Sequence, residues 1–159
     1  MKVVIVSDTH GMHRTFEDVI EIENDLDLLL HLGDVEGGAV FMEEVAGCEC
    51  HFVSGNNDFF DDLPEEETVE VAGKKIWMTH GHTYYVGFGL DEILEAGKEK
   101  GADIILFGHI HRPVWEEIDG ITILNPGSLT YPRQMGRRPT YIVMTASDKG
   151  DITYEFKEL

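Results

Sequence analysis

The stretch KVVIVSDTHG, residues 2–11, decides the fold. Its first part, KVVIVS, is an almost unbroken apolar run, which is typical of a strand covered on both faces in a mostly parallel sheet. Asp8 and His10 follow directly and lie two residues apart. Side-chain direction alternates with a period of two in extended chain, so the pair is expected to point the same way at the end of a buried strand.

Similar apolar runs recur along the first third of the chain. Further buried strands are expected at 26–32 and 50–55, and amphipathic helices are expected at about 13–23 and at 38–47. Strands that alternate with helices in this way predict parallel strands joined by right-handed crossovers. The first third is therefore interpreted as a βαβαβ unit.

Hairpins and one further βα segment fill the rest of the chain. The patterns predict a hairpin at 67–81 turning at 72–74, a helix at 89–101, a strand at 103–108, a hairpin at 114–126 turning at Asp119-Gly120, and a hairpin at 138–159 turning at Asp148 to Gly150. We expect one mixed α/β (α+β) domain over residues 1–159, parallel in its first half and largely antiparallel in its second.

Composition limits the class of protein. The chain has 159 residues, of which 42% are hydrophobic, and this is enough to bury a core. No apolar run approaches the roughly 20 residues that cross a bilayer, and Asp8 and His10 interrupt the N-terminal run too early for a signal peptide. A cytoplasmic protein without membrane contact is expected.

The formal net charge of −19 also narrows the choice of partners. Binding to extended DNA or RNA needs Lys and Arg to neutralise phosphates, so such a partner is not expected. A small phosphorylated substrate remains compatible with the charge, because a local site can have the opposite sign to the whole surface. Bound divalent cations would offset part of the acidity.

Polar clusters stand at the carboxyl ends of the expected strands, each beside a glycine. Ligands bind at this edge in open α/β sheets. The clusters are Ser7-Asp8-Thr9-His10-Gly11, Gly33-Asp34, Gly55-Asn56-Asn57-Asp58, His80-Gly81-His82 and Gly108-His109-Ile110-His111. Asp, His and Asn donors without Cys suit Mn, Fe, Zn, Ni or Co better than calcium or a structural zinc. Each cluster alone is a weak signal, but the ordered set predicts a metal site.

In this order the motifs D-x-H, G-D, G-N-x-D, H and G-H-x-H resemble the calcineurin-like metallophosphoesterase superfamily. The resemblance runs from Asp8 to the segment NPGSLTYPR at 125–133, which looks like the small phosphodiesterase branch. It implies a four-layer αββα sandwich of two mixed β-sheets flanked by helices. It also implies a binuclear metal site at the strand ends and a phosphoric ester hydrolase, specifically a phosphodiesterase.

The resemblance implies a ligand set for two divalent transition-metal ions, with Mn favoured and Ni, Fe, Zn or Co as alternatives. One ion would be held by Asp8, His10 and His111, the other by Asn56, His80 and His109, with Asp34 bridging both. A hydroxide between the ions would attack the phosphate ester, so no nucleophile from the protein is assigned. The hydroxyls of Ser7, Thr9 and Ser128 are expected to support the site.

One position departs from the family pattern. Many relatives have histidine, thought to protonate the leaving group, where this chain has Asn57. An amide donates a hydrogen bond but does not give up a proton near neutral pH. Either His82 replaces that acid or the substrate has a leaving group that needs little help. Asn57, His82 and Arg133 are predicted substrate contacts, with a mobile surface loop as the alternative for Arg133.

A second reading of the same fold is a protein-interaction scaffold with little catalytic activity, like the retromer scaffold subunit. All the ligand positions hold residues able to bind metal, which favours the enzyme. A homo-oligomer is possible on either reading. His31, within LLLHLG, is expected to be a core histidine with satisfied hydrogen bonds.

Overall fold

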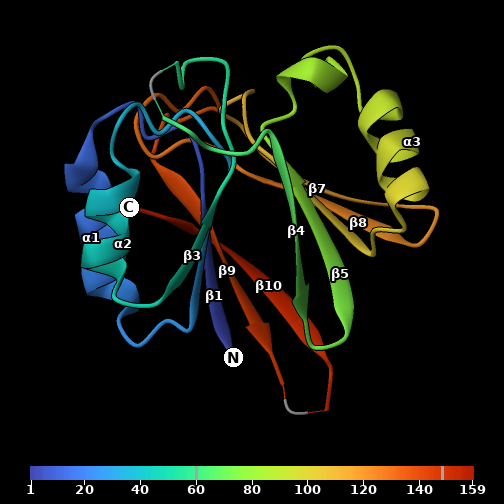
Figure 1. The fold of residues 1–159 in the computed structure, drawn as a ribbon, viewed down its shortest axis with the longest axis horizontal. Helices are drawn as coiled ribbons and strands as arrows, with labels where there is room; N and C mark the ends of the chain where they lie inside the picture. The colour runs from blue at the N-terminus through green and yellow to red at the C-terminus, as the bar shows by residue number, and fades with distance from the viewer. Residues whose placement is uncertain (60, 148) are drawn as a thin grey trace.

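The computed structural model describes residues 1–59, 61–147 and 149–159. These residues form two sheets packed face to face with helices on both outer faces (Figure 1). Helices α1 (His13–Glu23) and α2 (Ala39–Ala46) cover the first sheet, and α3 (Asp91–Lys100) covers the second. The αββα arrangement predicted from the sequence is confirmed. No helix in the described ranges is both long and apolar enough to cross a membrane.

The first sheet has the strand order β10-β9-β1-β2-β3. Its strands are β1 (Lys2–Val6), β2 (Leu28–His31), β3 (Glu49–Phe52), β9 (Thr140–Ala146) and β10 (Ile152–Glu158). β1, β2 and β3 are parallel, as the βαβαβ pattern predicts, and β9 pairs antiparallel with both β1 and β10. The last hairpin of the chain thus extends the sheet that the first strand begins.

The second sheet has the strand order β4-β5-β6-β8-β7. Its strands are β4 (Glu66–Val71), β5 (Lys74–Thr79), β6 (Ile104–Phe107), β7 (Pro113–Ile118) and β8 (Ile121–Pro126). The predicted hairpins are antiparallel, but β6 is parallel to both β5 and β8. β5 and β6 are parallel because α3 connects them instead of a tight turn, and the hairpins make the rest of the second half antiparallel, as expected.

Two hairpin turns have the backbone that their sequences predict. Ala72 and Gly73 have φ angles of 52° and 74°, and Asp119 and Gly120 have 54° and 79°. Positive φ at both central residues is the pattern of a two-residue hairpin turn that follows the twist of the strands. The third hairpin, β9–β10, also forms, but Asp148 in its predicted turn lies outside the described residues.

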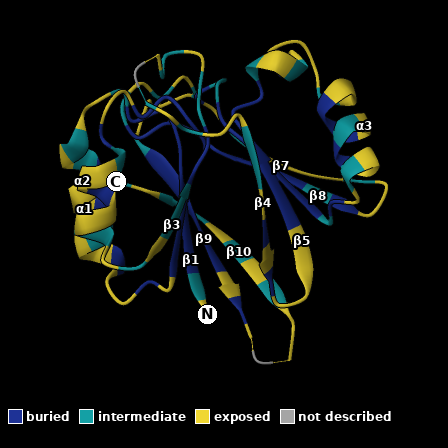
Figure 2. Cartoon of the chain, viewed as in Figure 1, coloured by how far each residue is buried: buried dark blue, intermediate teal, exposed yellow. Residues whose placement is uncertain are grey.

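Burial on both faces explains the apolar run that opens the chain. Val3 and Ile5 of β1 point into the core between the sheets, whereas Val4 and Val6 pack against the side of α1 and α2. A strand with helices on one face and a second sheet on the other has no solvent-facing positions, so alternation disappears from its sequence. Figure 2 shows the central strands buried and the outer helix surfaces exposed.

The carboxyl ends of the parallel strands of both sheets lie at one edge of the molecule. The loops there are joined by backbone hydrogen bonds: Asp8 N–H donates to the Gly33 carbonyl at 3.1 Å, and Gly108 N–H donates to the His80 carbonyl at 3.1 Å. This edge lies at the top of Figure 1. A short 3₁₀ helix, η1 (His82–Tyr84), follows β5 there and was not predicted.

A buried carboxylate ties α1 to the first sheet. Glu23, at the end of α1, accepts hydrogen bonds from the Tyr141 hydroxyl and the Lys157 ammonium, both at 2.8 Å, and pairs with Lys2 at 2.8 Å. Burial acts to raise its pKa, but the lysine and tyrosine donors outweigh burial and lower the pKa of Glu23 from 4.5 to about 2. The carboxylate therefore stays ionised under all ordinary conditions.

We predict that Glu23→Gln lowers the free energy of unfolding by about 2 kcal/mol at pH 7, because charged hydrogen bonds in a buried site are lost. The pKa of Glu23 is lower in the folded state. Its stabilising effect is therefore complete above about pH 4.5 and declines as the pH falls toward 2. Urea unfolding at pH 7 and pH 3 measures both effects.

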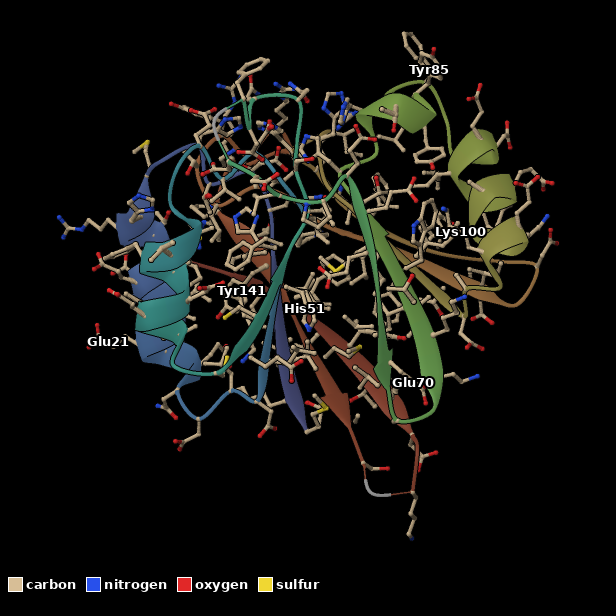
Figure 3. The ribbon with its side chains drawn as sticks, viewed as in Figure 1. Glu21, His51, Glu70, Tyr85, Lys100 and Tyr141 are labelled. Atoms are coloured by element: carbon tan, nitrogen blue, oxygen red, sulfur yellow. The ribbon has the colours of Figure 1, made fainter. Side chains whose placement is uncertain are left out.

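Glu21→Gln is the matched control, since Glu21 lies on the same helix and points away from the sheet into solvent (Figure 3). Equal losses of stability in the two variants would contradict the role assigned to Glu23.

Candidate metal centre

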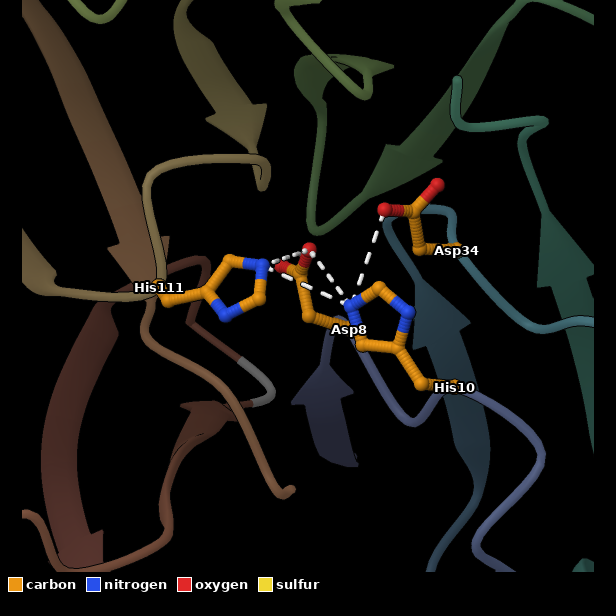
Figure 4. A group of neighbouring side chains, drawn as sticks. All are labelled: Asp8, His10, Asp34 and His111. Carbon is orange, nitrogen blue, oxygen red and sulfur yellow. Dashed lines mark hydrogen bonds and ion pairs between the residues drawn. The ribbon is translucent and has the colours of Figure 1, made fainter. Parts of the chain in front are cut away.

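Side chains from three strand ends meet in one place. Asp8 and His10 follow β1, Asp34 follows β2, and His111 follows β6. Each offers one ligand atom, and these atoms all lie within 4.8 Å of one another. Figure 4 shows both imidazole rings turned toward the carboxylates. Residues a hundred positions apart in the chain thus form one cluster of nitrogen and oxygen donors.

The contacts in this cluster are close. Nε2 of His111 lies 3.0 Å from Oδ1 of Asp8, and Nε2 of His10 lies 3.7 Å from Oδ2 of Asp34 and 3.9 Å from Oδ1 of Asp8. The two Nε2 atoms are 3.5 Å apart. The ligand group predicted for the first ion, together with the proposed bridge, is therefore brought together.

The ligand group predicted for the second ion also lies beside Asp34. Nε2 of His80 is 3.2 Å from Oδ1 of Asn56 and 3.5 Å from Oδ2 of Asp34. The ring of His109 lies 5.2 Å from that of His80, centroid to centroid, and its backbone N–H donates to Oδ2 of Asp8 at 3.2 Å. His109 and Asn56 both line a cavity of about 200 Å³ together with His10, Asp34 and His111.

Hydrogen bonds on the far side of each ring fix which nitrogen faces the cluster. Nδ1 of His80 donates to the Leu32 carbonyl at 2.6 Å and Nδ1 of His111 to the Tyr131 carbonyl at 2.8 Å. Nδ1 of His10 donates to the Glu36 carboxylate at 2.7 Å. With Nδ1 occupied on the far side, each ring turns its Nε2 atom inward. Metal-binding histidines are held in this way.

The result is a pocket in which the inward Nε2 atoms face oxygens that only accept. These oxygens belong to the carboxylates of Asp8 and Asp34 and to the amide of Asn56. The Oδ1 atom of Asp8 is buried without a well-directed hydrogen bond from any described residue. Such an arrangement repels itself unless positive charge lies between the atoms, as protons on the rings or as cations. The donor set of imidazole, carboxylate and amide fits divalent transition metals.

Both carboxylates are held in their ionised form. Burial acts to raise the pKa of Asp8, but the close ring of His111 and the charge of His80 keep it below its usual range. Burial has the same effect on Asp34, where His80 and the donors of Asn57 lower the pKa. The site therefore carries two negative charges that attract cations.

The backbone is strained at the predicted ligands. Left-handed φ angles of 46° to 70° occur at Asp8, His10, Asp34, His109 and His111. For residues other than glycine this conformation costs on the order of 1–3 kcal/mol, and it persists at sites where the surroundings enforce it. The chain turns sharply at each strand end, which aims the side chain back over the sheet edge.

Glycines next to the ligands allow the strand ends to approach closely. A Cβ atom on Gly55 would lie 2.2 Å from Oδ1 of Asp34, and one on Gly108 would lie 2.1 Å from Oγ of Ser7 and 3.1 Å from Oδ2 of Asp8. Neither position accepts a side chain without moving a carboxylate. Gly55 and Gly108 are thus explained by their close approach to the Asp34 carboxylate and to Ser7 and Asp8.

Hydroxyl groups support the site in the way expected from the sequence. Ser7 donates to Oδ2 of Asp8 at 2.6 Å, and Ser128 donates to the Asp8 carbonyl at 2.9 Å. Thr9 bonds to Nε2 of His31 at 3.0 Å, while Nδ1 of His31 accepts from Gly33 N–H. Burial lowers the pKa of His31 to about 3, so this ring is a neutral core histidine, as predicted.

Of the predicted substrate contacts, Asn57 and Arg133 line the cavity, whereas His82 lies beside His80 and is not among the lining residues. Asn57 donates to both oxygens of Asp34, through its backbone N–H at 2.8 Å and through Nδ2 at 2.7 Å. Arg133 lines the cavity, and its backbone N–H donates to the His111 carbonyl at 2.9 Å. The ring of His82 lies 5.4 Å from that of His80 and 6.1 Å from that of His109.

Two residues at the site were not found by sequence reasoning. Glu36 holds the ring of His10, and Tyr131 supplies the carbonyl that holds His111 and also lines the cavity. Glu36 stands two positions after Asp34, the same spacing as the D-x-H and H-x-H pairs, so the signal was present. The Tyr131 carbonyl carries no signal in the sequence, because any residue has one.

Comparison with known proteins agrees with this geometry. Residues 1–149 match the family model of the calcineurin-like phosphoesterase superfamily domain. The chain belongs to this superfamily. The superfamily is one of metallophosphoesterases. This membership explains why aspartates and histidines cluster at the strand ends.

Curated relatives carry metallophosphoesterase names. The probable metallophosphoesterase YsnB of Bacillus subtilis is 34% identical over 148 residues, which cover 91% of this chain and 84% of YsnB. Phosphodiesterase MJ0936 of Methanocaldococcus jannaschii is 32% identical over 145 residues, which cover 80% of this chain and 83% of that protein.

Solved structures have the same fold. A conserved protein of Streptococcus pneumoniae, described as a predicted phosphoesterase, matches with a TM-score of 0.85 at 30% identity, covering 99% of this chain and 88% of the other. Vps29 of Entamoeba histolytica, crystallised with Zn²⁺, matches with a TM-score of 0.79 at 22% identity over 99% of both chains. The second likeness concerns the fold alone.

We predict that Gly55→Ala weakens Mn²⁺ binding by at least ~10-fold, because the new methyl group displaces the carboxylate of Asp34. Gly89→Ala is the control, since a Cβ atom there meets nothing within 4 Å. Isothermal titration with Mn²⁺ measures the affinities, and circular dichroism checks that both variants are folded. Equal affinities in two folded variants would show that the close approach of Gly55 is unimportant for the site.

Proposed function

We propose that the protein is a metal-dependent phosphodiesterase with two divalent transition-metal ions. The observation that carries the proposal is the set of inward-facing Nε2 atoms around two ionised carboxylates, each ring held from behind by a hydrogen bond. One ion would be held by Asp8, His10 and His111, and the other by Asn56, His80 and His109. Asp34, which lies between the two groups, would be shared.

When bound, the ions would activate a water molecule between them as the attacking hydroxide and would neutralise charge on the phosphoryl oxygens. Manganese is favoured by the mixture of carboxylate, amide and imidazole donors, with Ni, Fe, Zn and Co as alternatives. Residues of the chain hold the metal ligands in position before the substrate binds. Such preorganisation is usually the largest electrostatic contribution to lowering the activation barrier.

Residues around the ions have supporting roles. Asn57 holds both oxygens of Asp34, so the shared carboxylate is oriented by two donors. Asp58 accepts from the N–H groups of Gly55 and Glu36 at 2.8 and 2.7 Å, which fixes the loop that carries Asn56 and Asn57. Arg133, at the rim of the cavity, is placed to contact a bound phosphate.

A diester or an activated ester is favoured over an inert monoester. The position where many relatives have a histidine acid holds Asn57, and its amide is already committed to Asp34. Without that acid, the leaving group must depart with little protonation. The name of the similar M. jannaschii protein, a phosphodiesterase, points the same way.

We predict that the protein loaded with Mn²⁺ or Ni²⁺ hydrolyses bis-p-nitrophenyl phosphate faster than p-nitrophenyl phosphate. Asp34→Ala is expected to lower kcat/KM by ~10³-fold and to abolish tight metal binding, because both ions lose a shared ligand. Release of p-nitrophenolate and elemental analysis of the dialysed protein measure these effects.

Asp18→Ala, an exposed aspartate on α1, is the control. A folded wild-type protein that takes up no divalent transition metal and turns over neither ester would favour the alternative, an interaction scaffold on the same fold.

A further inference from the structure

A basic recess opens next to the metal centre. It has a volume of about 310 Å³ and is lined by Gly87, His109, Ile110, Arg112 and Arg133. His109 and Arg133 also line the cavity that contains the candidate ligands. The two hollows share these two residues and are therefore adjacent.

The two arginines of the recess are available to a ligand. Among the described residues, neither guanidinium has a carboxylate within ion-pair distance, although the chain contains 31 Asp and Glu residues against 12 Lys and Arg. Arg138, by contrast, lies 3.8 Å from Glu158. Both recess arginines are exposed, and Arg133 is anchored through its backbone N–H to the His111 carbonyl. In so acidic a chain, two such cations beside one cavity favour an anionic ligand group.

Of the two candidates for an acid that protonates a departing alkoxide, His82 is not among the described residues that line the cavity, and the other position holds Asn57. The amide of Asn57 donates to Asp34 and holds no transferable proton. A substrate that suits this site has a leaving group that is stable as an anion. A phosphate is such a group, since its last proton dissociates with a pKa of about 6.

We propose that the preferred substrate is a phosphoric anhydride in which the leaving group is itself a phosphate, bound in the recess by Arg112 and Arg133. This inference rests on the proposed function and narrows its substrate class. The attacked phosphorus has two substituents, as in a diester: an ester oxygen and the oxygen that bridges to the departing phosphate. Guanidinium groups bind phosphate oxygens by paired, charge-assisted hydrogen bonds.

The reaction balances as a hydrolysis. The oxygen of water bonds to the attacked phosphorus and the bond from that phosphorus to the bridging oxygen breaks. The electron pair of the broken bond leaves on the departing phosphate. One proton of the water stays on the new P–OH group and the other goes to the departing phosphate or to solvent, and nothing is oxidised or reduced. The arginines stabilise the phosphate that departs, whose negative charge grows as the bond breaks.

A comparison of two substrates tests whether the recess recognises the phosphoryl oxygens of the leaving group or only requires a leaving group that departs without a proton. ADP has a phosphate leaving group, whereas bis-p-nitrophenyl phosphate releases p-nitrophenolate, which also departs without a proton but has no phosphoryl oxygens. We expect the Mn²⁺-loaded wild type to convert ADP to AMP and phosphate with the larger kcat/KM. In Arg112→Gln, the ratio of kcat/KM for ADP to that for bis-p-nitrophenyl phosphate should fall by ~10-fold or more. Arg138→Gln is the matched control and should keep the wild-type ratio.

Binding gives a readout that does not depend on turnover. The analogue α,β-methylene-ADP, in which the bridging oxygen is replaced by carbon, should bind the Mn²⁺-loaded wild type ~10-fold more tightly than Arg112→Gln in isothermal titration. Arg112→Lys should recover part of the loss, because it restores the charge without the planar pair of donors.

The outcomes distinguish the two proposals. Hydrolysis of bis-p-nitrophenyl phosphate without hydrolysis of ADP would overturn the anhydride inference and leave the phosphodiesterase proposal standing. An unchanged ratio and unchanged analogue binding in Arg112→Gln would overturn the role of the recess. Absence of turnover with both substrates in folded, metal-loaded protein would overturn the proposed function itself.

Discussion

The site depends on two buried carboxylates that are kept ionised. Asp8 is fully buried and Asp34 nearly so, and each faces Nε2 atoms of imidazole rings whose Nδ1–H groups donate to carbonyls on the far side. An isolated charge in such a place would cost several kcal/mol, so the fold must supply compensating positive charge. The loop geometry follows from that need. Left-handed backbone at the ligands and glycines between the strand ends bring the compensating groups within reach.

The sandwich supplies the rigidity that this arrangement requires. β1, β2 and β6 are buried along their whole lengths apart from Lys2, and their carboxyl ends cannot shift without disturbing the core between the sheets. Glu23 locks α1 onto β1, β9 and β10 away from the site. The surrounding packing thus stabilises the strained backbone at the ligands. The candidate functional side chains all lie at a single edge of the sandwich.

Much of this could be predicted from the sequence because the signals are local. Strands buried on both faces have unbroken apolar runs, hairpin turns have residues that tolerate positive φ, and the polar clusters stand where strands end. The strands beside β6 could not be predicted from such local signals, because pairing partners are set by tertiary packing. The roles of the Leu32 and Tyr131 carbonyls were beyond sequence reasoning for the same reason. Asn57 was taken as a substrate contact, and only the structure reveals its bonds to Asp34.

The central claim is that Asp8, Asp34 and the surrounding histidines enclose two cations. Anomalous diffraction at the manganese edge, from crystals grown with Mn²⁺, tests it most directly. The account predicts two anomalous peaks in the cavity, one against Asp8, His10 and His111 and one against Asn56, His80 and His109, with Asp34 contacting both. Crystals with no manganese peak in this cavity, or with peaks only at surface carboxylates, would contradict it.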